Sequence, residues 1–152
     1  SKKRVLITGH TGFKGSWISV LLSFFGANIL GISNNIPTNP SHFKLIEKKI
    51  SLNSKKIDIY NFNEFEKTIK NYKPDFIFHL AAQSLVKKSY KKPLETWKTN
   101  TLGTINLLEI LKKYKKKITV VIITSDKVYR NVEKKSICPL RTKSFKSRFE
   151  VV

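Results

Sequence analysis

The sequence predicts an α/β protein with a doubly wound parallel sheet, and three observations point to it. Residues 4–8, "RVLIT", form a short apolar run rich in β-branched residues, which is typical of a buried strand. A glycine-rich turn and an amphipathic helical pattern follow directly. Strand and helix patterns then alternate up to "KITVVIITS" at residues 117–125, whose continuous apolar character suits the middle of a sheet covered on both faces.

Five strands and four helices are expected in alternation. The strands are predicted at residues 4–8, 28–33, 55–61, 75–82 and 117–125. The helices are predicted at residues 13–26, 41–49, 61–73 and 92–115. Asn61 or Asn63 is the expected N-cap of the third helix, and Pro93 suits the first turn of the fourth. In the first helix five apolar residues can share one face: Phe13, Trp17, Val20, Leu21 and Phe24.

The composition fits a soluble, globular domain. The chain has 152 residues, of which 40% are hydrophobic, and this is enough to bury a core. The single cysteine, Cys138, excludes an internal disulfide framework and suits a reducing compartment. The basic start "SKKRVLIT" is too short for a signal peptide, and the apolar run at residues 18–32 is shorter than the ~20 residues of a membrane span. We therefore expect a cytoplasmic protein without a membrane segment.

The net charge of +20 is large, and such a field attracts anions, including nucleic acid. The basic residues are mostly lysines spread along the chain, which indicates a compositional bias and not a built patch. The run "KKYKKK" at residues 112–117 is typical of the solvated end of a helix, where cations complement the dipole. No basic helix with interleaved aromatic residues is found, so no nucleic-acid partner is expected. No metal site is predicted either.

Three glycines after the first strand suggest a dinucleotide-binding loop. In a doubly wound sheet, ligands bind beyond the carboxyl ends of the strands, where this loop lies. Gly9 permits a tight turn, Gly12 lets the backbone approach a pyrophosphate, and Gly15 allows the helix to pack on the strand. The helix N-terminus then offers free N–H groups to the phosphates. The spacing is G-x-x-G-x-x-G and not the commoner G-x-G-x-x-G.

The end of the second predicted strand, "GISNN", lacks the acidic residue that usually binds the adenosine ribose. Ser33 and Asn34 could hydrogen-bond a ribose hydroxyl instead, and this leaves the choice between NAD and NADP open. Asp58, after the third strand, could accept a hydrogen bond from the adenine amino group. It could equally be a solvated carboxylate at a strand end.

Several motifs in order resemble the extended short-chain dehydrogenase/reductase superfamily, which has a Rossmann fold. They are "TGHTGFKGSW", "IPTNPSHF", "FHLAAQSLVKKSY", "PLETWKTNTLGTINLLE" and "TSDKVYRN", and they cover about residues 4–131. Within the superfamily they most resemble the CDP-glucose 4,6-dehydratases. The resemblance implies an NAD-dependent lyase, in which hydride leaves the sugar C4, water is lost across C5 and C6, and hydride returns to C6.

The resemblance also implies roles for individual residues. Ser125 would hydrogen-bond the C4 oxygen, Asp126 would protonate the leaving hydroxyl, and Lys127 lies where related dehydratases keep the C5 base. Thr99 or Asn100 would pack behind the nicotinamide side of the cofactor. The complete set of expected cofactor-binding residues is Gly9, His10, Thr11, Gly12, Phe13, Gly15, Ser33, Asn34, Asp58, Ile59, Leu80, Ala81, Ala82, Gln83, Asn100 and Thr124.

The chain departs from the superfamily pattern toward its C-terminus. None of the five tyrosines is followed by a lysine four residues later, so the catalytic Tyr-x-x-x-Lys pair is absent. We expect an NAD-binding domain at residues 1–131 and a basic tail at 132–152 that lacks the family pattern. A truncation or frame change before the substrate domain would explain this. Family members are commonly homodimers, but the next helix of the dimer interface is absent, so dimerisation of this chain is in doubt.

Three alternatives to an active CDP-glucose 4,6-dehydratase or its cofactor-binding fragment remain open. The first is a nucleotide-sugar epimerase or reductase of the same superfamily. The second is an inactive truncated product. The third, least favoured, is a basic nucleic-acid-binding module.

Overall fold

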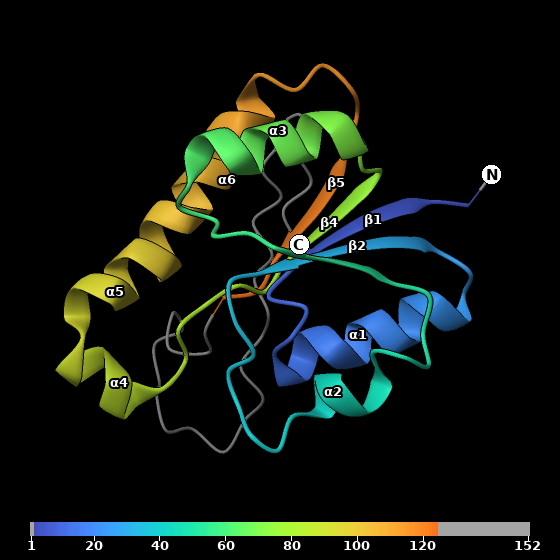
Figure 1. Ribbon diagram of the computed structural model, residues 1–152. Helices are drawn as coiled ribbons and strands as arrows, with labels where there is room; N and C mark the ends of the chain where they lie inside the picture. The colour runs from blue at the N-terminus through green and yellow to red at the C-terminus, as the bar shows by residue number, and fades with distance from the viewer. Residues whose placement is uncertain (1, 125–152) are drawn as a thin grey trace, which may run out of the picture.

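The computed structural model describes residues 2–124. A five-stranded parallel sheet lies between two layers of helices (Figure 1). The strands are β1 (Arg4–Thr8), β2 (Asn28–Ser33), β3 (Asn53–Lys56), β4 (Phe76–His79) and β5 (Thr119–Ile122). Their order in the sheet is β3-β2-β1-β4-β5, so the chain runs outward from β1 in one direction and then resumes on its other side. The predicted doubly wound parallel sheet is confirmed.

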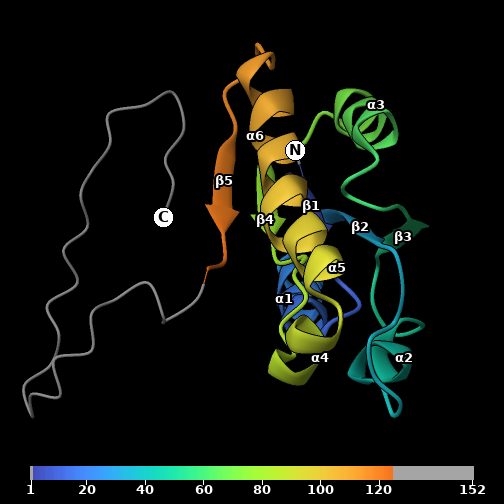
Figure 2. The ribbon, with the colours of Figure 1, turned by 90° about the vertical axis from the view of Figure 1, so that its left-hand side faces the viewer.

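The helices divide between the two faces of the sheet. Helices α1 (Phe13–Phe24) and α2 (His42–Ile46) cover one face, below the sheet in Figure 1. Helices α3 (Phe62–Tyr72) and α6 (Gly103–Lys112) cover the other face. Two shorter helices, α4 (Val86–Lys91) and α5 (Pro93–Trp97), continue the second layer beyond the ends of the strands, as Figure 2 also shows. None of these helices is long and apolar enough to cross a bilayer.

The alternation of side chains along β1 places a core on each side of the sheet. Leu6 is fully buried in the larger core, where it belongs to one cluster with Phe65 of α3 and Leu107 of α6. Val5 and Ile7 point the other way, into a smaller core beneath α1. Both faces of the central strand are therefore covered, as a parallel sheet requires.

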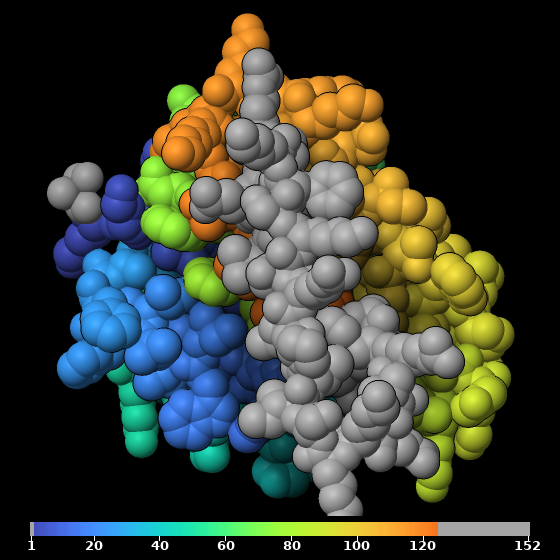
Figure 3. Space-filling view, turned by 180° about the vertical axis from the view of Figure 1, so that it is seen from behind, coloured from blue at the N-terminus to red at the C-terminus, as the bar shows by residue number. Residues whose placement is uncertain are grey.

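Helix α1 packs with the opposite face to the one its apolar residues suggest. Its buried residues are small, namely Gly15, Ser16 and Ser19. Trp17 is 52% exposed and Phe24 is 83% exposed. The close approach of the first turn of α1 to the glycine loop leaves no room for a side chain at Gly15, and further along the same face Ile18 and Leu22 pack against the smaller core. Figure 3, seen from behind, also shows this part of the chain (blue) on the molecular surface.

Other differences from the prediction concern the boundaries of elements. The predicted helix at residues 92–115 consists of α5, a π-helical turn at Lys98–Leu102 and α6, and α4 was not predicted. Strand β3 begins and ends earlier than predicted, so the buried Ile57 and Ile59 follow it. In the part of the chain that the structure describes, β5 pairs only with β4 and lies at one end of the sheet, not in its middle. The predicted boundary after residue 131 lies outside the described residues.

Candidate functional site

A pocket opens at the carboxyl ends of the strands, where β1 and β4 lead to helices on opposite faces of the sheet. This is the topological switch point at which doubly wound sheets bind ligands. Ten of the predicted cofactor-binding residues line it: Gly9, Thr11, Gly12, Ser33, Asn34, Asp58, Ile59, Leu80, Ala81 and Ala82. These residues follow four different strands and are brought together only by the folded sheet.

The glycine loop is shaped by two close contacts. Gly9 has a φ of +72°, and a Cβ atom there would lie 2.8 Å from the backbone nitrogen of Ala81. A Cβ atom on Gly15 would overlap the carbonyl oxygen of Gly9 and lie 2.8 Å from Cα of His10. Glycine at both positions lets β1, the loop and α1 pack against each other and against the end of β4.

The N-terminus of α1 lies at the pocket, and no side chain of the described residues caps its first amides. Gly12 is the N-cap residue, and no side chain caps the helix. The first turn contains no acidic residue that could neutralise the positive end of the helix dipole. The N–H groups of Phe13 and Lys14 have no acceptor within the helix, because the first turn of any helix leaves its donors unpaired. This arrangement can bind a phosphate or pyrophosphate.

A buried network of side chains fixes the end of β4 against β1. The Thr8 hydroxyl accepts hydrogen bonds from the backbone N–H groups of Leu80 and Ala81, at 3.1 Å each. Its proton is then donated to Nδ1 of His79, 2.8 Å away. Nε2 of His79 therefore carries the ring proton and donates to Thr104 at 3.1 Å.

This network requires a neutral imidazole. Burial lowers the pKa of His79 to about 4. The ring is therefore uncharged at neutral pH. The network holds the backbone of Leu80 and Ala81, which line the pocket, against the end of β1.

The end of β2 is joined to the glycine loop and to the segment after β3. The hydroxyl oxygens of Thr11 and Ser33 lie 2.7 Å apart, and each is within hydrogen-bond distance of the carbonyl oxygen of Asn35. The side-chain amide of Asn34 donates to Asp58 at 3.2 Å. Polar groups from three segments thus converge at the side of the pocket where the adenosine was predicted to bind.

His10 does not contribute its side chain to the pocket. The ring is buried, with only 1% exposed, and packs edge-on against Phe43 of α2. Its Nε2 is hydrogen-bonded to Ser54 of β3 at 2.8 Å, and a Cβ atom on Gly31 would collide with the ring. The side chain of His10 thus anchors the loop beneath the pocket, in the space that Gly31 leaves, and the predicted contact of His10 with the cofactor stays a prediction.

The other predicted cofactor-binding residues do not line the pocket. The side chain of Phe13 is 71% exposed, and Gly15 is buried one turn into α1. Gln83 lines an adjoining groove that shares Asn34 and Ala82 with the pocket. Asn100 does not line the groove itself but forms two hydrogen bonds with the backbone of Gln83. Thr124 is exposed after β5.

Sequence reasoning missed some lining residues, and some predictions remain untested. Asn35, Pro37 and Ile57 also line the pocket, and Thr99, one of two alternatives, lines it too. Asn35 and Ile57 could have been predicted from their positions within two residues of the ends of β2 and β3. The predicted catalytic residues Ser125, Asp126 and Lys127 lie outside the described residues.

Comparison with known proteins identifies the family. Residues 6–144 match the sequence profile described as GDP-mannose 4,6 dehydratase. The chain belongs to this family. It is 46% identical over 131 residues to CDP-glucose 4,6-dehydratase of Salmonella typhimurium, which covers 86% of this chain and 36% of that protein. It is 32% identical over 112 residues to dTDP-glucose 4,6-dehydratase of Haemophilus influenzae, covering 72% of this chain and 33% of that protein.

Solved structures of the superfamily share the fold. UDP-glucose 4-epimerase of Thermus thermophilus, in complex with NAD, matches with a TM-score of 0.66 and 29% sequence identity. The match covers 78% of this chain and 36% of that chain. The chain spans about a third of the length of the first relatives that it matches. The resemblance inferred from the motifs is thus confirmed for the N-terminal part of the family.

Proposed function

We propose that this chain forms the NAD-binding part of a CDP-glucose 4,6-dehydratase. The observation that carries this proposal is the 46% identity over 131 residues to the Salmonella typhimurium enzyme of that name. The pocket at the switch point supports it, because its glycine loop, free helix amides and small residues are the features that a dinucleotide needs.

In the proposed complex the pyrophosphate lies against the N-terminus of α1, beside Gly12. Ser33 and Asn34 lie at the adenosine ribose, and Asp58 accepts a hydrogen bond from the adenine amino group. Ala81 and Ala82 lie along the nicotinamide half, where their small side chains let the cofactor approach the backbone. When bound, NAD would accept hydride from the sugar C4 and return it to C6, so that water is lost without net oxidation.

We further propose that three residues after β5 act on the sugar, on the strength of the resemblance. Ser125 hydrogen-bonds the C4 oxygen, Asp126 protonates the leaving C6 hydroxyl, and Lys127 removes the C5 proton. Lysine can act as a base only where burial or nearby cations lower its pKa. The Tyr-x-x-x-Lys pair that takes the C4 hydroxyl proton in the superfamily is absent. The chain alone is therefore expected to bind NAD without turning over CDP-glucose.

Calorimetric titration of the purified chain with NAD⁺ tests the proposal. One NAD⁺ is expected to bind per chain, and ADP-ribose is expected to compete because it carries the adenosine and the pyrophosphate. Nicotinamide mononucleotide, which lacks the adenylate half, is the matched control and should bind much more weakly. A folded chain that binds neither NAD⁺ nor ADP-ribose would contradict the proposal. Turnover of CDP-glucose by the chain alone would contradict the role given to the missing tyrosine and lysine.

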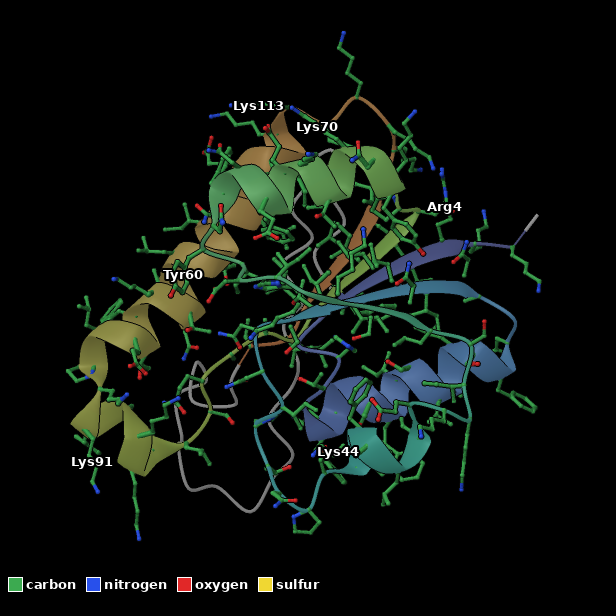
Figure 4. All side chains as sticks on the ribbon, in the orientation of Figure 1. Arg4, Lys44, Tyr60, Lys70, Lys91 and Lys113 are labelled. Atoms are coloured by element: carbon green, nitrogen blue, oxygen red, sulfur yellow. The ribbon has the colours of Figure 1, made fainter. Side chains whose placement is uncertain are left out.

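Within residues 2–124, the distribution of charge gives no specific support to a nucleic-acid-binding function. Figure 4 shows Lys44, Lys70, Lys91 and Lys113 on the outside of the molecule, on or beside four different helices. Basic residues that lie on several sides do not form the continuous stripe that follows a nucleic-acid backbone.

A further inference from the structure

We infer that Asn34 and Asp58 act as a pair that makes the pocket select NAD over NADP. The inference rests on the proposed function, because it concerns the adenosine end of the same site. The two cofactors differ only in the 2′ position of the adenosine ribose, which carries a hydroxyl group in NAD and a phosphate in NADP. The residues at the end of β2 are the ones that meet this position in a doubly wound sheet.

The pair links the ends of two neighbouring strands. Nδ2 of Asn34, just after β2, donates to Oδ2 of Asp58, two residues after β3, at 3.2 Å. The other carboxylate oxygen of Asp58 accepts a hydrogen bond from the backbone N–H of Tyr60 at 3.3 Å. Because the amide group of Asn34 donates to Asp58, its carbonyl oxygen is the end left to accept the proton of a 2′-hydroxyl group.

The charge of the pocket acts against a 2′-phosphate. Asp58 is the only charged residue among the described residues that line the pocket, and neither lysine nor arginine is among them. Lys88 and Lys98 line the adjoining groove, which shares Asn34 with the pocket, but not the pocket itself. A phosphate beside Asn34 would therefore meet the Asp58 carboxylate without a cation in the pocket lining to pair with it, and like charges repel. In other doubly wound sheets a carboxylate at the end of β2 usually binds the ribose hydroxyl and repels a 2′-phosphate. Here Asn34 supplies the hydroxyl acceptor, and Asp58, bonded to Asn34, supplies the negative charge.

Titration of the full chain with NAD⁺ and with NADP⁺ tests this inference. The wild-type chain should bind NAD⁺ at least about tenfold more tightly than NADP⁺. Asp58→Asn removes the charge and keeps a group that can bond to Asn34. It should bring the ratio of the two dissociation constants toward one. The ratio is the useful quantity because both cofactors share the adenine contact and lose it equally.

Two further variants make the test specific. Asn34→Ala removes the hydroxyl acceptor and should weaken NAD⁺ binding several-fold while affecting NADP⁺ less. Glu47→Gln removes one negative charge from an exposed position beside α2 and should leave the ratio unchanged. Thermal unfolding of each variant verifies that it is folded.

The possible outcomes separate the two ideas. Equal affinity of the wild-type chain for NAD⁺ and NADP⁺, or tighter binding of NADP⁺, would overturn the inference and leave the proposed function standing. An unchanged ratio in Asp58→Asn would also overturn it. If the folded chain binds neither cofactor, both the inference and the proposed function fail.

Discussion

The side chain of Asn100 forms hydrogen bonds with both backbone polar groups of Gln83. Its Oδ1 accepts a hydrogen bond from the Gln83 N–H at 2.7 Å, and its Nδ2 donates to the Gln83 carbonyl oxygen at 3.0 Å. Asn100 lies in the π-helical turn between α5 and α6, and such turns often occur at functional sites. The turn thereby secures the segment after β4, which carries Ala81 and Ala82 into the pocket.

Replacement of Asn100 by leucine should loosen this segment. The loss of two hydrogen bonds is expected to lower the free energy of unfolding by about 1–2 kcal/mol. NAD⁺ affinity should fall as well, because the pocket wall is no longer fixed. Urea unfolding and calorimetric titration measure the two effects. Asn63→Leu, at an exposed position of α3, is the control and should change neither quantity appreciably.

The glycine loop should separate effects on folding from effects on binding. A Cβ atom on Gly15 would overlap the Gly9 carbonyl, so Gly15→Ala should cost about 1–3 kcal/mol of stability. Gly12 has a φ of −73°, and the nearest atom to an added Cβ is 3.3 Å away. Gly12→Ala should therefore fold almost normally but bind NAD⁺ less tightly, since its methyl group enters the pocket. Equal destabilisation by the two substitutions would show that α1 does not approach the loop as described.

The buried His79 should make the protein less stable in acid. Its pKa lies at about 4 in the folded state, against an ordinary value of 6.5. Between these values the unfolded chain binds a proton that the folded chain does not, so stability falls as the pH falls from 6.5 to 4. The difference corresponds to roughly 3 kcal/mol at the acid end of this range. Burial also lowers the pKa of His10, which adds to the effect in the same direction.

Urea unfolding at about pH 7.5 and at about pH 4.5 measures the change in stability over most of this range. In His79→Gln the loss of stability between the two pH values should be smaller than in the wild-type chain, because only His10 of the buried pair still titrates. The same loss in both proteins would mean that His79 is not held neutral by burial.

The exposed face of α1 should tolerate polar substitution. Phe24 is 83% exposed, so Phe24→Ser is expected to change stability by less than about 0.5 kcal/mol. Phe65 of α3 is fully buried, and Phe65→Ala should cost about 3–5 kcal/mol. Thermal or urea unfolding compares the two. A large loss in Phe24→Ser would show that this face of α1 is packed against something in solution.

Sequence reasoning succeeded where the signal is local. The bounds of β1 and β2 agree with the prediction, because each strand is a short apolar run that ends at polar or glycine residues. Of the ten predicted residues that line the pocket, Gly9, Gly12, Ser33, Asn34 and Asp58 were predicted from their places at the strand ends. The other five, Thr11, Ile59, Leu80, Ala81 and Ala82, were implied by the family resemblance. Strand β3 was displaced in the prediction because Ile57 and Ile59 are buried without belonging to a strand.

It failed where the decisive contact is made between different elements of the folded chain. Helical periodicity shows which residues of α1 share a face, but the fit of Gly15 against Gly9 decides which face points inward. The orientation of His10 likewise depends on Gly31 and on Ser54, which is 44 residues away. Neither relationship can be read from the local pattern.

The hydrogen bonds that the backbone N–H groups of Leu80 and Ala81 donate to Thr8 join segments that are more than 70 residues apart. During synthesis on a ribosome, therefore, a nascent chain would expose its glycine loop long before the opposite wall of the pocket exists. The dinucleotide could not be captured cotranslationally until the segment after β4 had emerged and docked on β1.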